Sequence, residues 1–148
     1  MIGKVLKLFI TNNNIEKTRI SMTSVDVDAL GVLGDKFYNQ NSQRSILITS
    51  AESYKITQEN NIDIGEGSLG ENILIDISPY HLVAGDEIRI GKTLFQITQN
   101  GTLCKGLSSV HSKLPKLLKH DRGVFAKVVK NEGKISLDDS VTIFKSKI

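Results

Sequence analysis

Hydrophobic and polar residues alternate in several short runs along the chain, and this period of two is typical of half-buried β-strands. In residues 18–25, Ile20 and Met22 fall on one side and Arg19 falls on the other. Residues 3–11 alternate more loosely, and the polar turn between these two runs predicts a hairpin. Further runs of this kind predict strands at 44–49, 73–77, 86–90, 93–98, 123–130, 134–136 and 139–144.

Two segments have helical features. Ser50 suits the N-cap position and Glu52 favours the first turn, so the sequence predicts a helix over 51–60. A second helical stretch is expected within 108–120, where Pro115 suits the first turn of a helix.

Strands outnumber helices, and the connections between them are short. Gly91-Lys92, for example, forms a plausible two-residue hairpin loop. About eight strands and two short helical stretches therefore predict a mainly β protein with a mostly antiparallel, barrel-like sheet. A length of 148 residues fits a single domain over 1–148. The long loop 27–43 stands out, because such loops are usually functional or disordered.

Composition restricts the class of protein. The net charge is only +3, and the basic run 113–122 has no aromatic residues for base stacking, so we expect no nucleic-acid partner. No apolar run is long enough to span a bilayer. The N-terminal segment has the pattern of a strand and not that of a signal peptide. One cysteine excludes an intramolecular disulfide framework, and we expect a cytoplasmic protein.

The single cysteine, Cys104, lies in a polar, glycine-rich stretch beside Lys105. A thiolate is the nucleophilic form of cysteine, and nearby cations such as Lys105 and Arg122 lower its pKa. Cys104 is therefore a candidate reactive thiol. The alternative, which local sequence leaves open, is an inert thiol that packs as a small hydrophobic group.

Two further groups of residues are candidates for ligand binding. Asp35 could orient a cation, and Arg44 could bind a phosphate or carboxylate with two parallel hydrogen bonds. The glycines of 67–72 let backbone amides approach a ligand, and Asn72 could bind an amide or ring edge. Each group also has a plainly structural interpretation, as a turn, an edge strand or a strand connection.

The order of these motifs resembles the MOSC family over about residues 3–145. The resemblance rests on Gly34-Asp35-Lys36, Arg44-Ser45-Ile46-Leu47-Ile48, Gly70-Glu71-Asn72-Ile73, Gly85-Asp86, Gly91, Cys104, Arg122-Gly123-Val124-Phe125-Ala126-Lys127-Val128 and Gly133-Lys134-Ile135. The chain looks like the small stand-alone members, which lack the pyridoxal-phosphate desulfurase half of the large sulfurases. The resemblance therefore implies no pyridoxal phosphate in this chain alone.

The resemblance implies a barrel-like fold with a pocket for a molybdenum-pterin cofactor. Cys104 then carries sulfur or binds molybdenum. The implied pocket positions are Asp35, Arg44, Gly70, Glu71, Asn72, Lys105 and Arg122. The expected partners are the cofactor or its sulfur donor, and a redox partner protein.

The sequence departs from the family pattern at three places. Phe37 and Lys105 stand where members often have histidine, and Asp138-Asp139 replaces a late Gly-Asp. Three functions therefore stay open: a cofactor-binding sulfur carrier or sulfur transferase, a molybdenum-dependent reductase component for N-hydroxylated compounds, and a binding protein without catalysis.

Overall fold

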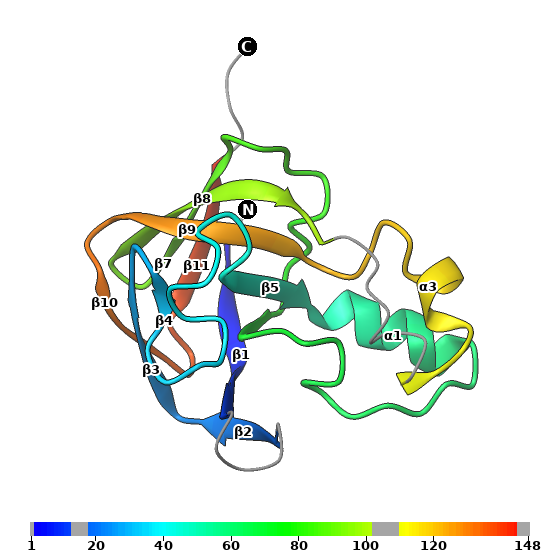
Figure 1. Cartoon of the computed structure of the whole chain (residues 1–148). Helices are drawn as coiled ribbons and strands as arrows, with labels where there is room; N and C mark the ends of the chain where they lie inside the picture. Colours follow the sequence, from blue (N-terminus) through cyan, green and yellow to red (C-terminus); the bar gives the residue numbers. More distant parts are fainter. Residues whose placement is uncertain (1, 13–17, 102–109, 145–148) are drawn as a thin grey trace.

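The computed structural model describes residues 2–12, 18–101 and 110–144, and a ring of hydrogen-bonded strands is its main feature (Figure 1). The strands of this ring are β1 (Ile2–Asn12), β5 (Ile46–Ser50), β6 (Ile73–Ile75), β7 (Glu87–Ile90), β8 (Thr93–Asn100), β9 (Val124–Lys130) and β11 (Ser140–Phe144). Their order is β11-β7-β8-β9-β5-β6-β1, and β11 pairs with β1 again. The predicted mainly β, barrel-like fold is confirmed.

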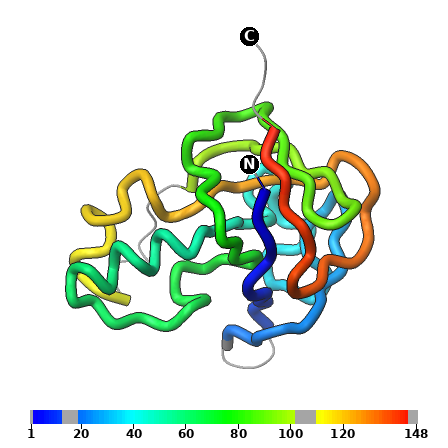
Figure 2. Tube along the Cα trace, turned by 180° about the vertical axis from the view of Figure 1, so that it is seen from behind, coloured from blue at the N-terminus to red at the C-terminus, as the bar shows by residue number. Residues whose placement is uncertain are grey.

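The barrel closes because β1 is long enough to have two partners along one edge. Its first half pairs with β11, with Ile2 opposite Thr142. Its second half pairs with β2 (Thr18–Met22), with Leu8 opposite Met22. Figure 2 shows the two ends of the chain, blue and red, running side by side at this closure.

A second, three-stranded sheet lies beside the barrel. It contains β3 (Ser24–Asp28), β4 (Gly31–Val32) and β10 (Gly133–Ser136), in the order β10-β3-β4. The prediction of one strand over 18–25 is therefore wrong, because the chain bends at Thr23. The residues before the bend pair with β1, whereas those after it pair with β10.

Successive side chains of a strand point to opposite faces, so the two faces of β5 and β9 have different surroundings. In β5, Ile46 and Ile48 belong to the barrel core, while Leu47 between them faces a cavity outside it. The same holds for the partner strand β9, where Phe125 lies opposite Leu47. Burial of aliphatic side chains such as these contributes about 1.5–3 kcal/mol each, so the barrel interior stabilises the fold.

Two helices, α1 (Ala51–Glu59) and α3 (Leu114–Leu117), lie on one side of the barrel (Figure 1). They cover a second hydrophobic core made of Tyr54, Ile62, Leu69, Leu74, Leu114 and Leu118. None of the helices in the described residues is long and apolar enough to cross a membrane.

Several local predictions are confirmed. The Ser50 side chain accepts a hydrogen bond from the Glu52 N–H at 3.1 Å, as expected of an N-cap. Gly91-Lys92 joins β7 to β8 as an antiparallel hairpin, with Ile90 opposite Thr93. Among the described strand pairs only β5–β6 is parallel.

Asn72 joins three strands with its backbone and its side chain. Its N–H donates to the Leu47 carbonyl at 2.9 Å, and its side-chain oxygen accepts the Leu47 N–H at 3.1 Å. On the other side its carbonyl accepts the Phe9 N–H at 2.8 Å, and its side-chain amide donates to the Phe9 carbonyl at 3.3 Å. Asn72 thus connects β5 to β1 at the start of β6.

Replacing Asn72 with alanine leaves the Leu47 N–H and the Phe9 carbonyl without these partners. A buried unpaired polar group costs about 1–3 kcal/mol, so Asn72→Ala should lower the free energy of unfolding by roughly 2–5 kcal/mol in urea denaturation. Asn60→Ala is the control, because the exposed Asn60 side chain donates only to the Ile56 carbonyl. Equal losses in both variants would contradict this role for Asn72.

Candidate functional site

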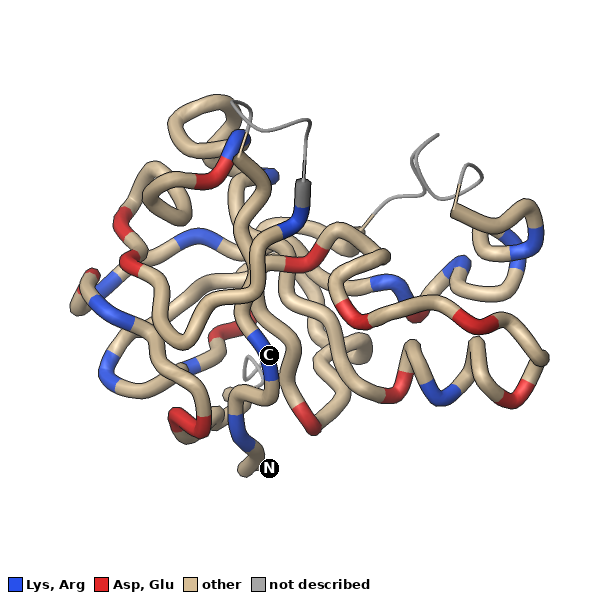
Figure 3. The backbone as a smooth tube through the Cα atoms, turned by 90° about the horizontal axis from the view of Figure 1, so that it is seen from below, with Lys and Arg blue, Asp and Glu red and all other residues tan. Residues whose placement is uncertain are grey.

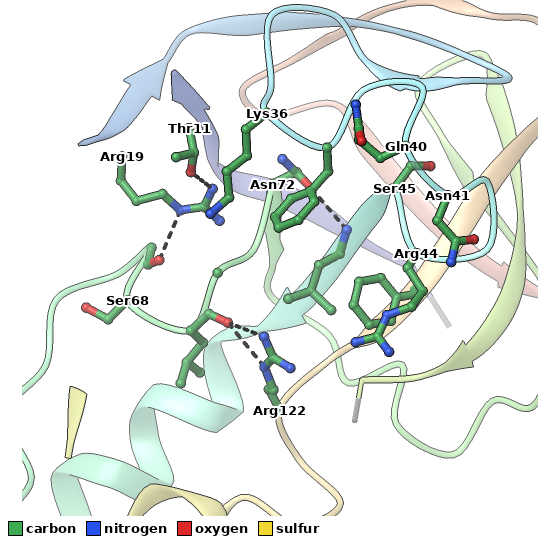
Figure 4. Close-up of a pocket in the computed structure, with 16 residues that line it drawn as sticks. Thr11, Arg19, Lys36, Gln40, Asn41, Arg44, Ser45, Ser68, Asn72 and Arg122 are labelled. Atoms are coloured by element: carbon green, nitrogen blue, oxygen red, sulfur yellow. Dashed lines mark hydrogen bonds between the residues drawn. The ribbon is translucent and has the colours of Figure 1, made fainter. Parts of the chain in front are cut away.

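A cavity of about 550 Å³ lies outside the barrel, between β1, β2, the loop before β5, the turn 67–70 and the start of β9 (Figure 4). The residues that line it are Thr11, Arg19, Lys36, Phe37, Gln40, Asn41, Arg44, Ser45, Leu47, Gly67, Ser68, Leu69, Gly70, Asn72, Arg122 and Phe125. Its volume lies in the usual range for small-molecule sites.

Four cationic side chains line this cavity: Arg19, Lys36, Arg44 and Arg122. No Asp or Glu is among the described lining residues. Elsewhere on the backbone, basic and acidic residues are interspersed (Figure 3), and the net charge is small. The cavity is therefore a local concentration of positive charge, which favours an anionic ligand.

Backbone carbonyls of the turn 67–71 hold two of these arginines. Arg19 Nε donates to the Gly67 carbonyl at 3.3 Å, and Arg19 Nη2 donates to the Glu71 carbonyl. Arg122, which is only 7% exposed, donates from Nε and Nη2 to the Leu69 carbonyl, both at 3.3 Å. The positions of both guanidinium groups thus depend on one turn.

Asp35 and Glu71 lie behind the cavity wall. One Asp35 carboxylate oxygen accepts the Thr11 N–H at 2.7 Å and lies 3.9 Å from Arg19 Nη1. Glu71 is fully buried beneath the turn. Burial lowers the pKa of Arg19, while the charge of Asp35 opposes this shift. An arginine stays protonated in such a site.

The other two cations lie against aromatic rings at the rim. The Arg44 guanidinium is 4.9 Å from the centre of the Phe125 ring. The Lys36 ammonium is 4.7 Å from the centre of the Phe37 ring, which is about half exposed. Stacking of this kind restrains a flexible cation without neutralising it.

The structure brings four of the predicted pocket residues together: Arg44, Gly70, Asn72 and Arg122 all line the cavity. The side-chain amide of Asn72 makes hydrogen bonds to the backbone of Leu47 and Phe9, so Asn72 stabilises the cavity wall. Asp35 and Glu71 support the wall from behind. Cys104 and Lys105 lie outside the described residues.

Sequence reasoning missed Arg19 and did not assign Lys36. Arg19 falls on the polar side of its strand, opposite Ile20 and Met22, and any solvent-facing residue has the same pattern. Lys36 was visible as the third residue of Gly34-Asp35-Lys36, and this motif was the available signal. Tyr54 was also missed, because a helical tyrosine usually belongs to the core.

Comparison with known families shows which family this chain belongs to. The family model of the MOSC domain matches residues 33–142. The chain belongs to the MOSC domain family. The matched region contains the loop, the turn and the arginine before β9 that together form most of the cavity.

Solved structures share the fold. YuaD from Bacillus subtilis superposes with a TM-score of 0.85 at 18% identity, over 99% of this chain and 98% of that chain. YiiM from Geobacillus stearothermophilus superposes with a TM-score of 0.72 at 18% identity, over 97% of this chain and 75% of that chain. YiiM from Escherichia coli superposes with a TM-score of 0.69 at 20% identity, over 100% of this chain and 71% of that chain. No match was found among curated proteins.

Gly67 tests how tightly the turn is packed. Gly67 and Gly85 both have a left-handed backbone, with φ of 93° and 97°. A Cβ on Gly67 would lie 3.1 Å from the Phe9 ring, whereas one on Gly85 would meet no atom within 4 Å. Gly85→Ala should cost about 1–2 kcal/mol of unfolding free energy from backbone strain.

Gly67→Ala should cost about 1–3 kcal/mol more than Gly85→Ala, because the Phe9 ring must move. Urea denaturation of the two variants measures the difference. Equal destabilisation would show that the turn tolerates a side chain at Gly67.

Proposed function

We propose that this MOSC protein binds the molybdenum-pterin cofactor in the cationic cavity and uses Cys104 as a sulfur carrier or molybdenum ligand. The observation that carries the proposal is the set of four cations around a cavity without an acidic lining residue in the described chain. The pterin cofactor carries a phosphate group, and arginine and lysine are the side chains best suited to bind phosphate.

The walls of the cavity also suit a planar, polar ring. Leu47, Phe37 and Phe125 supply apolar surface, while Gln40 and Asn41 supply amide groups. The Ser45 hydroxyl is buried and has no hydrogen-bond partner among the described residues. A ligand hydrogen bond to a group of this kind would remove the cost of leaving it unpaired.

The last described residue before the Cys104 segment is next to this cavity. The Gly101 N–H donates to the Gly123 carbonyl at 2.8 Å, beside Arg122. A Cβ built on Gly101 would lie 3.4 Å from Leu47 Cδ1 in the cavity wall. Gly101, three residues before Cys104 in the sequence, thus lies beside a residue that lines the cavity, which supports a role for Cys104 there.

The proposed sulfur step needs a protein persulfide as donor. The Cys104 thiolate attacks the outer sulfur of the donor, a new S–S bond forms at Cys104, and the donor's S–S bond breaks to release a donor thiolate. Cationic neighbours favour the thiolate form that this attack requires. When bound, the cofactor supplies molybdenum, a metal for which a thiolate is a suitable soft ligand.

Arg44→Gln should weaken cofactor binding by roughly 10- to 100-fold, because a hydrogen bond to a charged group contributes about 1.5–3 kcal/mol. Arg89→Gln is a matched control, since Arg89 also lies over a phenylalanine, Phe144, at 5.2 Å but outside the cavity. Anaerobic equilibrium dialysis with purified cofactor, followed by pterin fluorescence, measures both dissociation constants. Absence of binding by the wild type would refute the proposal.

Cys104→Ser tests the sulfur step directly. After incubation with a persulfide donor, the wild type should gain the mass of one sulfur atom, and a thiol reductant should reverse the gain. The Cys104→Ser variant should show no change, because the chain has no other cysteine. Intact-protein mass spectrometry provides the measurement. If the wild type binds cofactor but gains no sulfur, the result would refute the sulfur-carrier role of Cys104 and leave the cofactor-binding role in place.

A further inference from the structure

The buried carboxyl of Glu71 makes an uneven set of hydrogen bonds. One oxygen, Oε2, accepts the Tyr54 O–H at 2.6 Å and the Gly67 N–H at 3.1 Å. The other oxygen, Oε1, is buried and has no partner among the described residues. Burial of a charged carboxylate oxygen without a hydrogen-bond partner costs much more free energy than burial of a neutral carboxyl group.

Tyr54, from α1, completes the contacts behind the turn. Its hydroxyl oxygen accepts the Gly67 N–H at 2.9 Å and the Leu69 N–H at 3.3 Å while it donates to Glu71. Burial raises the pKa of Tyr54, so the hydroxyl keeps the proton that it donates. Both groups thus bind N–H groups on the inner side of the turn.

The carbonyl groups of the same turn bind the arginines of the cavity. Gly67 and Glu71 accept hydrogen bonds from Arg19, and Leu69 accepts two from Arg122. The turn therefore connects a buried tyrosine–carboxyl pair on one side to two guanidinium groups on the other. Movement of the N–H groups away from Tyr54 would also move the carbonyls that orient both arginines.

We propose that Tyr54 and a protonated Glu71 are positioning residues that hold the turn 67–71 and, through it, the guanidinium groups of Arg19 and Arg122. This inference rests on the proposed binding of an anionic cofactor in the cavity. Neither residue lines the cavity itself, so each acts through the turn.

Burial raises the pKa of Glu71 above its ordinary value of 4.5, while the Tyr54 and Gly67 hydrogen bonds and the charge of Arg19 lower it. The charged and titratable groups that act on this site are Tyr54 from α1, Arg19 from β2 and Tyr80 before β7. Because the folded state binds this proton more tightly than the unfolded state, stability falls as pH rises from 4.5 through the folded pKa. Ionisation also adds a negative charge behind an anion site.

Four variants separate positioning from simple stability. Glu71→Gln has the shape of the neutral acid and keeps an acceptor, whereas Glu71→Met keeps the size and removes it. Tyr54→Phe removes the hydroxyl that binds the turn. Tyr80→Phe is the control, because its hydroxyl accepts the Ser50 N–H at the start of α1 and contacts no N–H of the turn.

The first measurement needs no ligand. Amide hydrogen exchange at Gly67 and Leu69, followed by NMR, should be roughly tenfold faster or more in Tyr54→Phe and Glu71→Met, since each loses a hydrogen bond of about 1 kcal/mol or more. Glu71→Gln and Tyr80→Phe should keep wild-type protection. Unchanged protection in Tyr54→Phe and Glu71→Met would refute the positioning role, whether or not the cofactor binds.

The second measurement is the pH dependence of cofactor affinity by anaerobic dialysis. Wild-type affinity should fall as pH rises through the pKa of Glu71, and Glu71→Gln should bind like the wild type at low pH without this fall. Glu71→Met should bind roughly tenfold more weakly or worse at every pH. Identical pH profiles for the wild type and Glu71→Gln would overturn the protonation. A wild type that binds no cofactor would instead refute the proposed function.

Discussion

The hydrogen bonds of the segment 67–72 connect the barrel wall, helix α1 and the arginines of the cavity. At its end, Asn72 ties β5 to β1 across the barrel wall. Before that, the inner N–H groups bind Tyr54 and Glu71, and the carbonyls bind Arg19 and Arg122. The buried polar groups of this segment are satisfied by partners from β1, β2, β5 and α1.

The barrel and the cavity have different physical origins. Aliphatic side chains that point inward from the strands fill the barrel, and Leu47 and Phe125, which point outward from β5 and β9, line the cavity. The cations come from loops and strand ends around these two residues. A rigid wall with charged loops is a common arrangement for binding sites, since loops vary without loss of the core.

Local sequence was enough for much of the fold. The Ser50 N-cap and the Gly91-Lys92 hairpin depend on residues a few positions apart, and both are present. The division of 18–25 was not predictable, because β2 pairs with β1 whereas β3 pairs with β10, more than a hundred residues away. The short helix α3 (Leu114–Leu117) lies within 108–120 and has Pro115 in its first turn, as the sequence predicted.

The sequence by itself determined that the protein is mainly β, and the order of its motifs identified the MOSC family. It also singled out Arg44, Gly70, Asn72 and Arg122, because these residues match pocket positions that the family resemblance implies. Only the tertiary structure decided that Asp35 and Glu71 lie behind the cavity and that Arg19 lies in it. The physical reason is that charge and burial depend on neighbours brought together by long-range strand pairing, which no local pattern records.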